Sequence, residues 1–193
     1  MSSQQRRLQM EIKYIKTTGN WREVADAART TIGMDEGKGE PSSEWKRKIL
    51  MAEHSPIRKL KIKWKWVELP YWVSTHIVRH KIGIEHFVRS QRADRTGIDR
   101  SDKSQSAKVE HEVESNAQAM INVSRKRLCN KAADKTQRAW LRVVNRLQAY
   151  KPELASVCVR ECVYRGFCPE MKPCEYTAKP EFELIRKEYV TQM

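Results

Sequence analysis

The chain has 193 residues, and its 38 lysines and arginines outnumber its 24 aspartates and glutamates, giving a formal net charge of +14. Hydrophobic residues make up 39% of the chain, which excludes a disordered polar segment and suits one domain with a single core. No apolar run approaches the ~20 residues of a membrane span, and the first ten residues lack the apolar part of a signal peptide. We therefore expect a cytoplasmic protein with no membrane partner.

The positive charge predicts an anionic partner, such as nucleic acid, anionic lipid or phosphorylated small molecules. The basic residues are spread from Arg6 to Arg186 without a block of five or more like charges, so they fit basic pockets as well as a basic face. The sequence has no zinc-finger spacing, ribonucleoprotein motif or recognisable helix-turn-helix, so it does not favour nucleic acid. Five cysteines without an export signal indicate free thiols or a metal rather than disulfides.

The N-terminal part is predicted to alternate strands and helices. Residues 10–17 alternate weakly, as a strand does, and Asn20 is a candidate N-cap for a helix that continues to about residue 31. Three glycines and a proline within residues 33–43 indicate a surface loop. A serine at the end of this loop is then expected to cap a helix over residues 45–54.

The clearest strand signal lies in residues 60–66, which read LKIKWKW. A period of two places the four apolar residues on one face and the three lysines on the other, which predicts a sheet with one buried face. Stacking of the tryptophans on nucleic-acid bases is the alternative. Pro70 then begins a predicted helix over residues 71–80, since proline is tolerated in a first turn.

The C-terminal half is predicted to be helical. Residues 81–106 indicate an ordered loop with a short strand, whereas apolar residues recur at helical spacing in residues 116–128 and 133–150. Strands followed by helices predict an α+β fold, with a mixed or antiparallel sheet flanked by helices. We expect one domain over residues 1–193, in which residues 158–193 form a short, irregular, cysteine-containing tail.

Several histidines and cysteines could in principle bind a metal. His54 is expected at a helix end, and His111 is expected on the surface of a strand or loop. Three cysteines from Cys162 to Cys174 are six residues apart, with Cys158 just upstream. This spacing is wider than the C-x₂₋₄-C of structural zinc sites, so we expect no metal but loop packing or free thiols, with a thiolate metal site as the alternative.

A basic segment over residues 79–92, RHKIGIEHFVRSQR, is the best candidate for chemistry. It has Arg79, His80 and Lys81 at the end of a predicted helix and Ser90, Gln91 and Arg92 about ten residues later. Arginine binds phosphate through two parallel hydrogen bonds, and serine hydroxyls and loop amides can complete such a site. The segment therefore predicts a phosphate site, and positive side chains that merely offset a helix dipole are the alternative.

This segment resembles the signature of the flavin-dependent thymidylate synthases, the ThyX family. The signature is Arg-His-Arg-x-x-Ser followed by Ser-x-Arg, and here Lys81 replaces the second arginine, Ile84 replaces the first serine and one residue is inserted before Ser90. Further similar motifs occur in the same order and cover most of the chain. They are AARTT from Ala27, Ser55–Pro56 before the strand, NAQAMINVSRKR over residues 116–127, and GFCPE before Cys174.

The resemblance implies a homotetramer that places FAD and dUMP at subunit junctions. It implies reductive methylation of dUMP to dTMP, with NADPH as reductant and 5,10-methylenetetrahydrofolate as the carbon donor. The implied FAD-binding residues are Ser55, Arg79, His80, Lys81, Asn116, Gln118 and Asn122. The implied dUMP-binding residues are His76, Arg79, Ser90, Gln91, Arg92, Arg100 and Arg127. The implied setting is a bacterium or a bacterial virus.

Arg127 matches the family arginine that polarises the uracil ring, and it is the implied catalytic residue. A fixed guanidinium stabilises the negative charge that develops on the ring carbonyls. Asn116 and Arg127 are eleven positions apart, about three helical turns, and should share a helix face. Gln118 and Asn122 are four positions apart and should share another.

Some residues depart from the family pattern. His76 stands in place of a glutamine and Gln118 in place of an arginine, in addition to the changes at positions 81 and 84. These departures leave two alternatives open. One is a related flavoenzyme that modifies C5 of another pyrimidine deoxynucleotide, and the other is a non-catalytic basic protein that binds nucleic acid.

Overall fold

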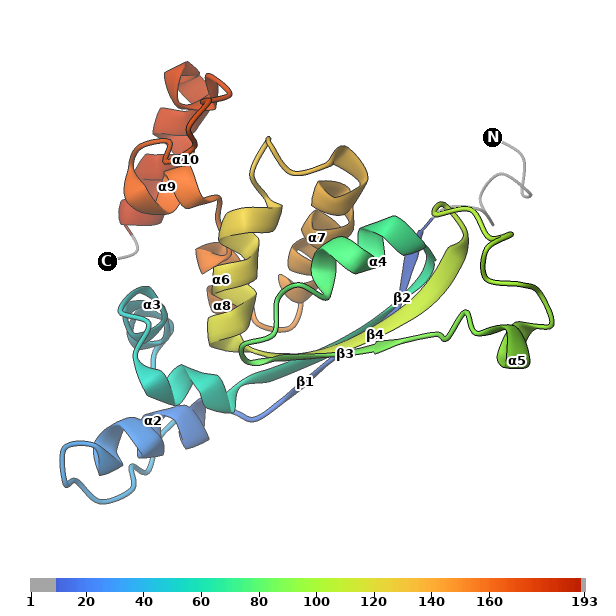
Figure 1. Cartoon of the computed structure of the whole chain (residues 1–193). Coiled ribbons are helices and arrows are strands. Elements are labelled where there is room, and N and C mark those ends of the chain that lie inside the picture. Colours follow the sequence, from blue (N-terminus) through green and yellow to red (C-terminus); the bar gives the residue numbers. More distant parts are fainter. Residues whose placement is uncertain (1–9, 192–193) are drawn as a thin grey trace.

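The structure is a computed structural model, and it describes residues 10–191 (Figure 1). The strands are β1 (Glu11–Thr18), β2 (Lys61–Pro70), β3 (Ile84–Val88) and β4 (Lys108–Asn116). The α-helices are α2 (Trp21–Thr30), α3 (Ser43–Met51), α4 (Tyr71–Ile77), α5 (Ala93–Thr96), α6 (Ala117–Arg127), α7 (Asp134–Leu147), α8 (Pro152–Val157), α9 (Glu161–Arg165) and α10 (Pro180–Val190). Two 3₁₀ helices are η1 (Ser55–Lys59) and η2 (Tyr176–Ala178).

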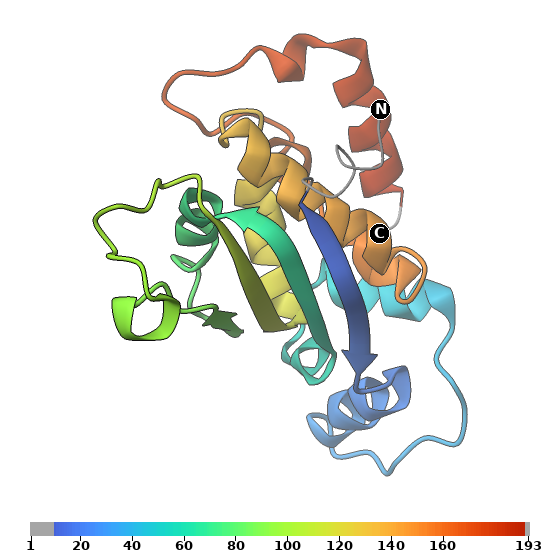
Figure 2. The same ribbon diagram turned by 90° about the vertical axis from the view of Figure 1, so that its right-hand side faces the viewer.

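The four strands form one antiparallel sheet in the order β1-β2-β4-β3. Helices α4, α6 and α7 lie over one face of this sheet, and no element within residues 10–191 covers the other face (Figures 1 and 2). The predicted α+β class with helices flanking the sheet is confirmed, and the sheet is antiparallel rather than mixed. None of the helices in the described part of the chain is long and apolar enough to cross a membrane.

The two faces of β2 have opposite environments, as the alternation of its residues predicts. Trp64 and Trp66 are fully buried and pack edge to face, and the ring of Trp64 lies 5.6 Å from that of Trp140 on α7. On the other face, Lys63 and Lys65 form ion pairs of 2.7 and 2.5 Å with glutamates of β4. The tryptophans are therefore core residues, and their burial argues against base stacking.

Helix ends agree with the predicted caps. The Asn20 side chain accepts a hydrogen bond from Glu23 N at 2.8 Å, and Ser42 accepts one from Trp45 N at 3.1 Å. Asn116, for which no cap was predicted, accepts one from Ala119 N at 2.9 Å and so begins α6. The helix that follows Pro70 ends at Ile77, three residues earlier than predicted.

Two predictions are wrong. His111 is not on the surface but fully buried, because residues 108–116 form the central strand β4 and the even-odd alternation turns His111 toward the helices. The tail after Cys158 is not irregular throughout. It includes α9 and α10, whose apolar residues Val163, Phe182 and Tyr189 join the hydrophobic core.

Adjacent residues of β2 provide a direct test of this two-faced sheet. Trp64→Ala should lower the free energy of unfolding by about 3–5 kcal/mol, because it leaves a cavity beneath α7. Lys63→Ala removes only an exposed ion pair and should leave stability nearly unchanged. Urea unfolding of both variants measures the difference, and equal losses would contradict the assignment of the faces.

Candidate functional site

A basic cluster forms where the end of α4 meets the end of α6. Arg127, the last residue of α6, donates from Nε to His80 Nε2 at 2.8 Å and from Nη2 to the His76 carbonyl at 2.7 Å. Arg79 lies in the loop that follows α4, next to His80. Burial is the larger cause that lowers the pKa of Arg127, and the positive charge of Arg79 lowers it further. The acceptors of Arg127 are an imidazole and a carbonyl, and no carboxylate within residues 10–191 forms an ion pair with it, so the guanidinium is fixed in place without being neutralised there.

A chain of hydrogen bonds from Ser74 through His111 and His86 fixes the backbone carbonyl of His80. His86 Nε2 bonds the His80 carbonyl at 2.7 Å, His86 Nδ1 bonds His111 Nε2 at 3.1 Å, and His111 Nδ1 bonds the hydroxyl of Ser74 at 3.1 Å. A carbonyl only accepts, so neutral His86 carries its proton on Nε2 and accepts on Nδ1. His111 then donates from Nε2, and Ser74 donates to His111 Nδ1. Four of the five histidines thus meet at this site.

Burial keeps these histidines neutral. It lowers the pKa of His111 to about 3, with a further contribution from His86. It lowers the pKa of His80 to about 4, assisted by the charge of Arg127. Neutral His80 retains the lone pair on Nε2 that receives the guanidinium hydrogen, so the low pKa and the contact with Arg127 support each other.

His76 closes the other side of the cluster. Its Nδ1 hydrogen bonds the hydroxyl of Thr136 on α7 at 3.1 Å, and its ring packs on Trp72. Burial lowers its pKa, and the charges of Arg127 and Arg79 lower it further. His76 therefore presents a neutral imidazole beside two arginines.

Gly83 fixes the loop between α4 and β3 against the start of α6. Its φ is +72°, and a Cβ built there would lie 2.5 Å from Asn116 Nδ2. Its carbonyl accepts a hydrogen bond from Asn116 N at 2.9 Å. Asn116 and Arg127 therefore hold the same loop from two ends of one helix face. Sequence reasoning did not single out Gly83, although a glycine between Lys81 and Ile84 was the available signal.

The opposite face of α6 has a separate polar cluster. Gln118 and Arg125 both donate to the carboxylate of Glu53, and Gln118 also bonds Asn122 at 3.3 Å. Ser55, at the start of η1, is exposed beside this cluster. The residues expected to bind FAD thus fall into two groups, one on each side of α6, with Lys81 exposed on the loop of Gly83.

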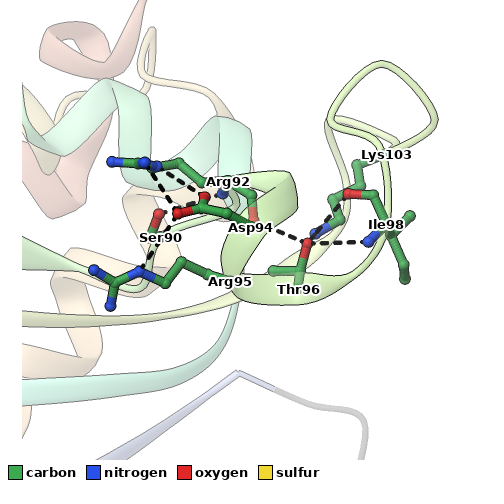
Figure 3. Close-up of polar contacts among 7 residues, drawn as sticks. All are labelled: Ser90, Arg92, Asp94, Arg95, Thr96, Ile98 and Lys103. Atoms are coloured by element: carbon green, nitrogen blue, oxygen red, sulfur yellow. Dashed lines mark hydrogen bonds and ion pairs between the residues drawn. The ribbon is translucent and has the colours of Figure 1, made fainter.

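The remaining expected residues lie on an arm formed by residues 89–107, which projects from the far end of β3 (Figure 1). Figure 3 shows both nitrogens of the Arg92 fork on Asp94, at 3.0 Å each. The Ser90 hydroxyl accepts from Arg92 N at 3.3 Å. Gln91 and Arg100 belong to the same arm, and its loop end is folded back by bonds from Thr96 to Ile98 and Lys103 (Figure 3). Within one copy, the arm lies away from helix α6, which Arg127 ends (Figure 1).

No family model and no curated protein matches the sequence. A structure of ThyX from Helicobacter pylori with FAD and dUMP aligns over 78% of this chain and 98% of that chain, with a TM-score of 0.62 and 15% identity. A second structure of that enzyme with FAD and dUMP has a TM-score of 0.62 and 15% identity, over 79% and 100%. A structure of the UMP/dUMP methylase PolB from Streptomyces cacaoi, bound with 5-Br dUMP, has a TM-score of 0.61 and 11% identity, over 82% and 96%. The chain therefore has a divergent ThyX-like fold.

The neutral histidines make a prediction for the pH dependence of stability. In the unfolded chain histidine has a pKa near 6.5, whereas the pKa of His80 is about 4 and that of His111 about 3 in the folded state. Between these values the unfolded chain binds protons that the folded chain does not, so the free energy of unfolding should fall as pH is lowered from about 6.5 to about 4.

Urea unfolding across this pH range measures the slope. His111→Gln should reduce the slope, because one histidine no longer titrates. His54→Gln is the matched control, since His54 is exposed and lies outside the hydrogen-bonded chain. Equal slopes for the wild-type protein and His111→Gln would contradict the neutral state of His111.

Proposed function

We propose that this protein is a flavin-dependent thymidylate synthase, which converts dUMP to dTMP with methylenetetrahydrofolate as carbon donor and NADPH as reductant. The observation that carries the proposal is Arg127, which donates to His80 and to the His76 carbonyl and has no carboxylate partner among the residues that the structure describes. The motif resemblance assigns this position to the uracil ring, and solved structures with the same fold contain FAD and dUMP.

In this proposal the chain's own residues bind the nucleotide and stabilise its charge. Arg127 donates to the ring carbonyls of uracil and stabilises the anion that forms there, an effect worth about 10²–10³ in rate for one such donor. His80, kept neutral by burial and held through its carbonyl by His86, fixes the direction of the guanidinium. The reduced flavin supplies the reducing equivalents when it is bound.

The donor chemistry of the expected FAD residues suits a dinucleotide. Arg79 and Lys81 are exposed cations that can bind its phosphates, and Ser55, Gln118 and Asn122 offer hydroxyl and amide groups for the rest. Helix α6 stands between these two groups, so we propose that one flavin is bound by residues of more than one copy.

The position of the arm supports a dUMP site that is likewise formed by residues of more than one copy. Ser90, Gln91, Arg92 and Arg100 would bind the phosphate of a nucleotide whose ring contacts Arg127 of another copy. The Arg92–Asp94 pair is exposed, so a phosphate dianion can replace the carboxylate at little cost. Phe87 on β3 and Ile98 on the arm are 59% and 54% exposed, which suits contact with another copy.

A second candidate is methylation of another pyrimidine nucleotide. The PolB methylase, which is described as acting on UMP and dUMP, matches the fold with a TM-score close to that of the thymidylate synthases. His76 and Lys81 depart from the thymidylate synthase signature at positions expected to contact the ligands. Product mass spectrometry with dUMP, UMP and dCMP separates the two candidates.

The flavin test uses the purified protein incubated with FAD. We expect a bound-flavin absorbance spectrum that shifts when dUMP is added, followed by dTMP formation with NADPH and methylenetetrahydrofolate. Arg127→Ala should retain the flavin and lose about 10²–10³ of the turnover rate. Arg138→Ala, at an exposed arginine paired with Asp134 on α7, is the control and should keep full turnover. A protein that binds no flavin, but binds oligonucleotides with a steep salt dependence, would contradict the proposal.

The shared site can be tested by mixing two inactive variants. Arg92→Ala and Arg127→Ala should each lack activity alone, because one loses phosphate binding and the other loses stabilisation of the ring. Co-expressed, they should regain part of the activity, since some sites receive an intact arm from one copy and an intact Arg127 from another. The same variants carried together on one chain provide the control and should stay inactive. No recovery in the mixture would contradict a site built from two copies.

A further inference from the structure

The C-terminal part of the chain brings together residues that the proposed reaction does not use. Four of the five cysteines line one small cavity: Cys129 just after α6, Cys162 in α9, and Cys168 and Cys174 in the loop that follows α9. The fifth, Cys158, lies apart in the hydrophobic core beside Ser124. The sequence spacing from Cys158 to Cys174 did not indicate that Cys129, which is distant in sequence, replaces Cys158 in this group.

The four sulfur atoms are near enough to influence one another. Burial raises the pKa of Cys129, and Glu170, Cys174 and Cys168 raise it further. Burial likewise raises the pKa of Cys162, with contributions from Cys129 and Cys168. These mutual effects connect all four thiols across three separate segments of the chain.

Two of the thiols already receive backbone hydrogen bonds. Lys131 N donates to Cys129 Sγ at 3.4 Å, and the backbone of Val163 bonds Cys162. An N–H donor favours a thiolate over a thiol, and such bonds orient sulfur ligands around a metal.

The loop from Gly166 to Glu175 has little else to hold it. It has no helix or strand, and its apolar side chains Phe167 and Met171 are 57% and 100% exposed. Burial of apolar area therefore contributes little against the entropy of ordering these residues. A metal bound between the loop, α9 and the end of α6 would supply the missing stabilisation.

We propose that Cys129, Cys162, Cys168 and Cys174 bind one zinc ion through four thiolates and fix this loop to the end of α6. Each thiol releases its proton to solvent on binding, and no oxidation or reduction takes place. Within residues 10–191, no three potential ligands already stand in a coordinating arrangement, so the ion has to draw the sulfurs together. Rotation of Cys168 and Cys174 on the exposed loop permits this, because neither belongs to a helix or strand.

Metal analysis of the full chain, purified under reducing conditions without added metal, tests the proposal. We expect about one zinc per chain and, after exchange with Co²⁺, the absorption of a tetrahedral cobalt–thiolate site. Cys168→Ser and Cys174→Ser should each weaken zinc binding at least about tenfold. Cys158→Ala is the matched control and should keep the metal. The absence of zinc and of cobalt–thiolate absorption would overturn the proposal, as would unchanged zinc binding in both serine variants.

Chymotrypsin cleavage after Phe167, which is 57% exposed on this loop, gives a second readout, which depends on neither flavin nor nucleotide. Removal of zinc by a chelator should speed cleavage of the wild-type protein at this site at least several-fold, and restored zinc should reverse the effect. Unchanged cleavage would show that no metal holds the loop. Because these measurements do not involve the reaction, their failure would leave the proposed thymidylate synthase activity unaffected.

Discussion

The candidate site depends on the buried contact between Arg127 and His80. In this contact the guanidinium of Arg127 stays charged, while the adjacent imidazole of His80 stays neutral. Desolvation removes the proton from His80, and the same desolvation lowers the pKa of Arg127, an effect that the two acceptors of its hydrogens partly offset. Because neither acceptor is an anion, the guanidinium keeps its full attraction for a ligand. The cluster is therefore arranged to receive a negative charge that the protein itself does not provide.

The sheet makes this arrangement possible. One face of β4 carries His111 into the core between Val109 and Val113, where it anchors the chain of hydrogen bonds that ends at His80. The other face carries glutamates that neutralise the lysines of β2. A shift of β4 by one residue would place His111 in solvent and glutamates in the core, so the register of the strands determines the electrostatics of the site.

Local patterns were sufficient to predict much of this fold. The alternation in β2, the caps at Asn20 and Ser42 and the helical spacing of α6 depend on neighbouring residues, and each is confirmed. His111 was misplaced because its neighbours are charged, and only pairing with β2 shows that those charges face lysines across the sheet. Cys129 was missed because it also depends on a contact between distant parts of the chain. Its proximity to Cys162 comes from packing of α6 against α9 and not from spacing in the sequence.

Helix α6 separates the residues that are expected to bind the ligands into two groups. Its two polar faces are on opposite sides of the same helix, and the arm extends from the far end of β3 (Figure 1). Side chains fixed by such short contacts cannot turn toward one another without breaking the core that holds them. In the proposed assembly, neighbouring copies supply the groups that one copy keeps apart, and the positive charge spread over the chain is divided among such shared pockets.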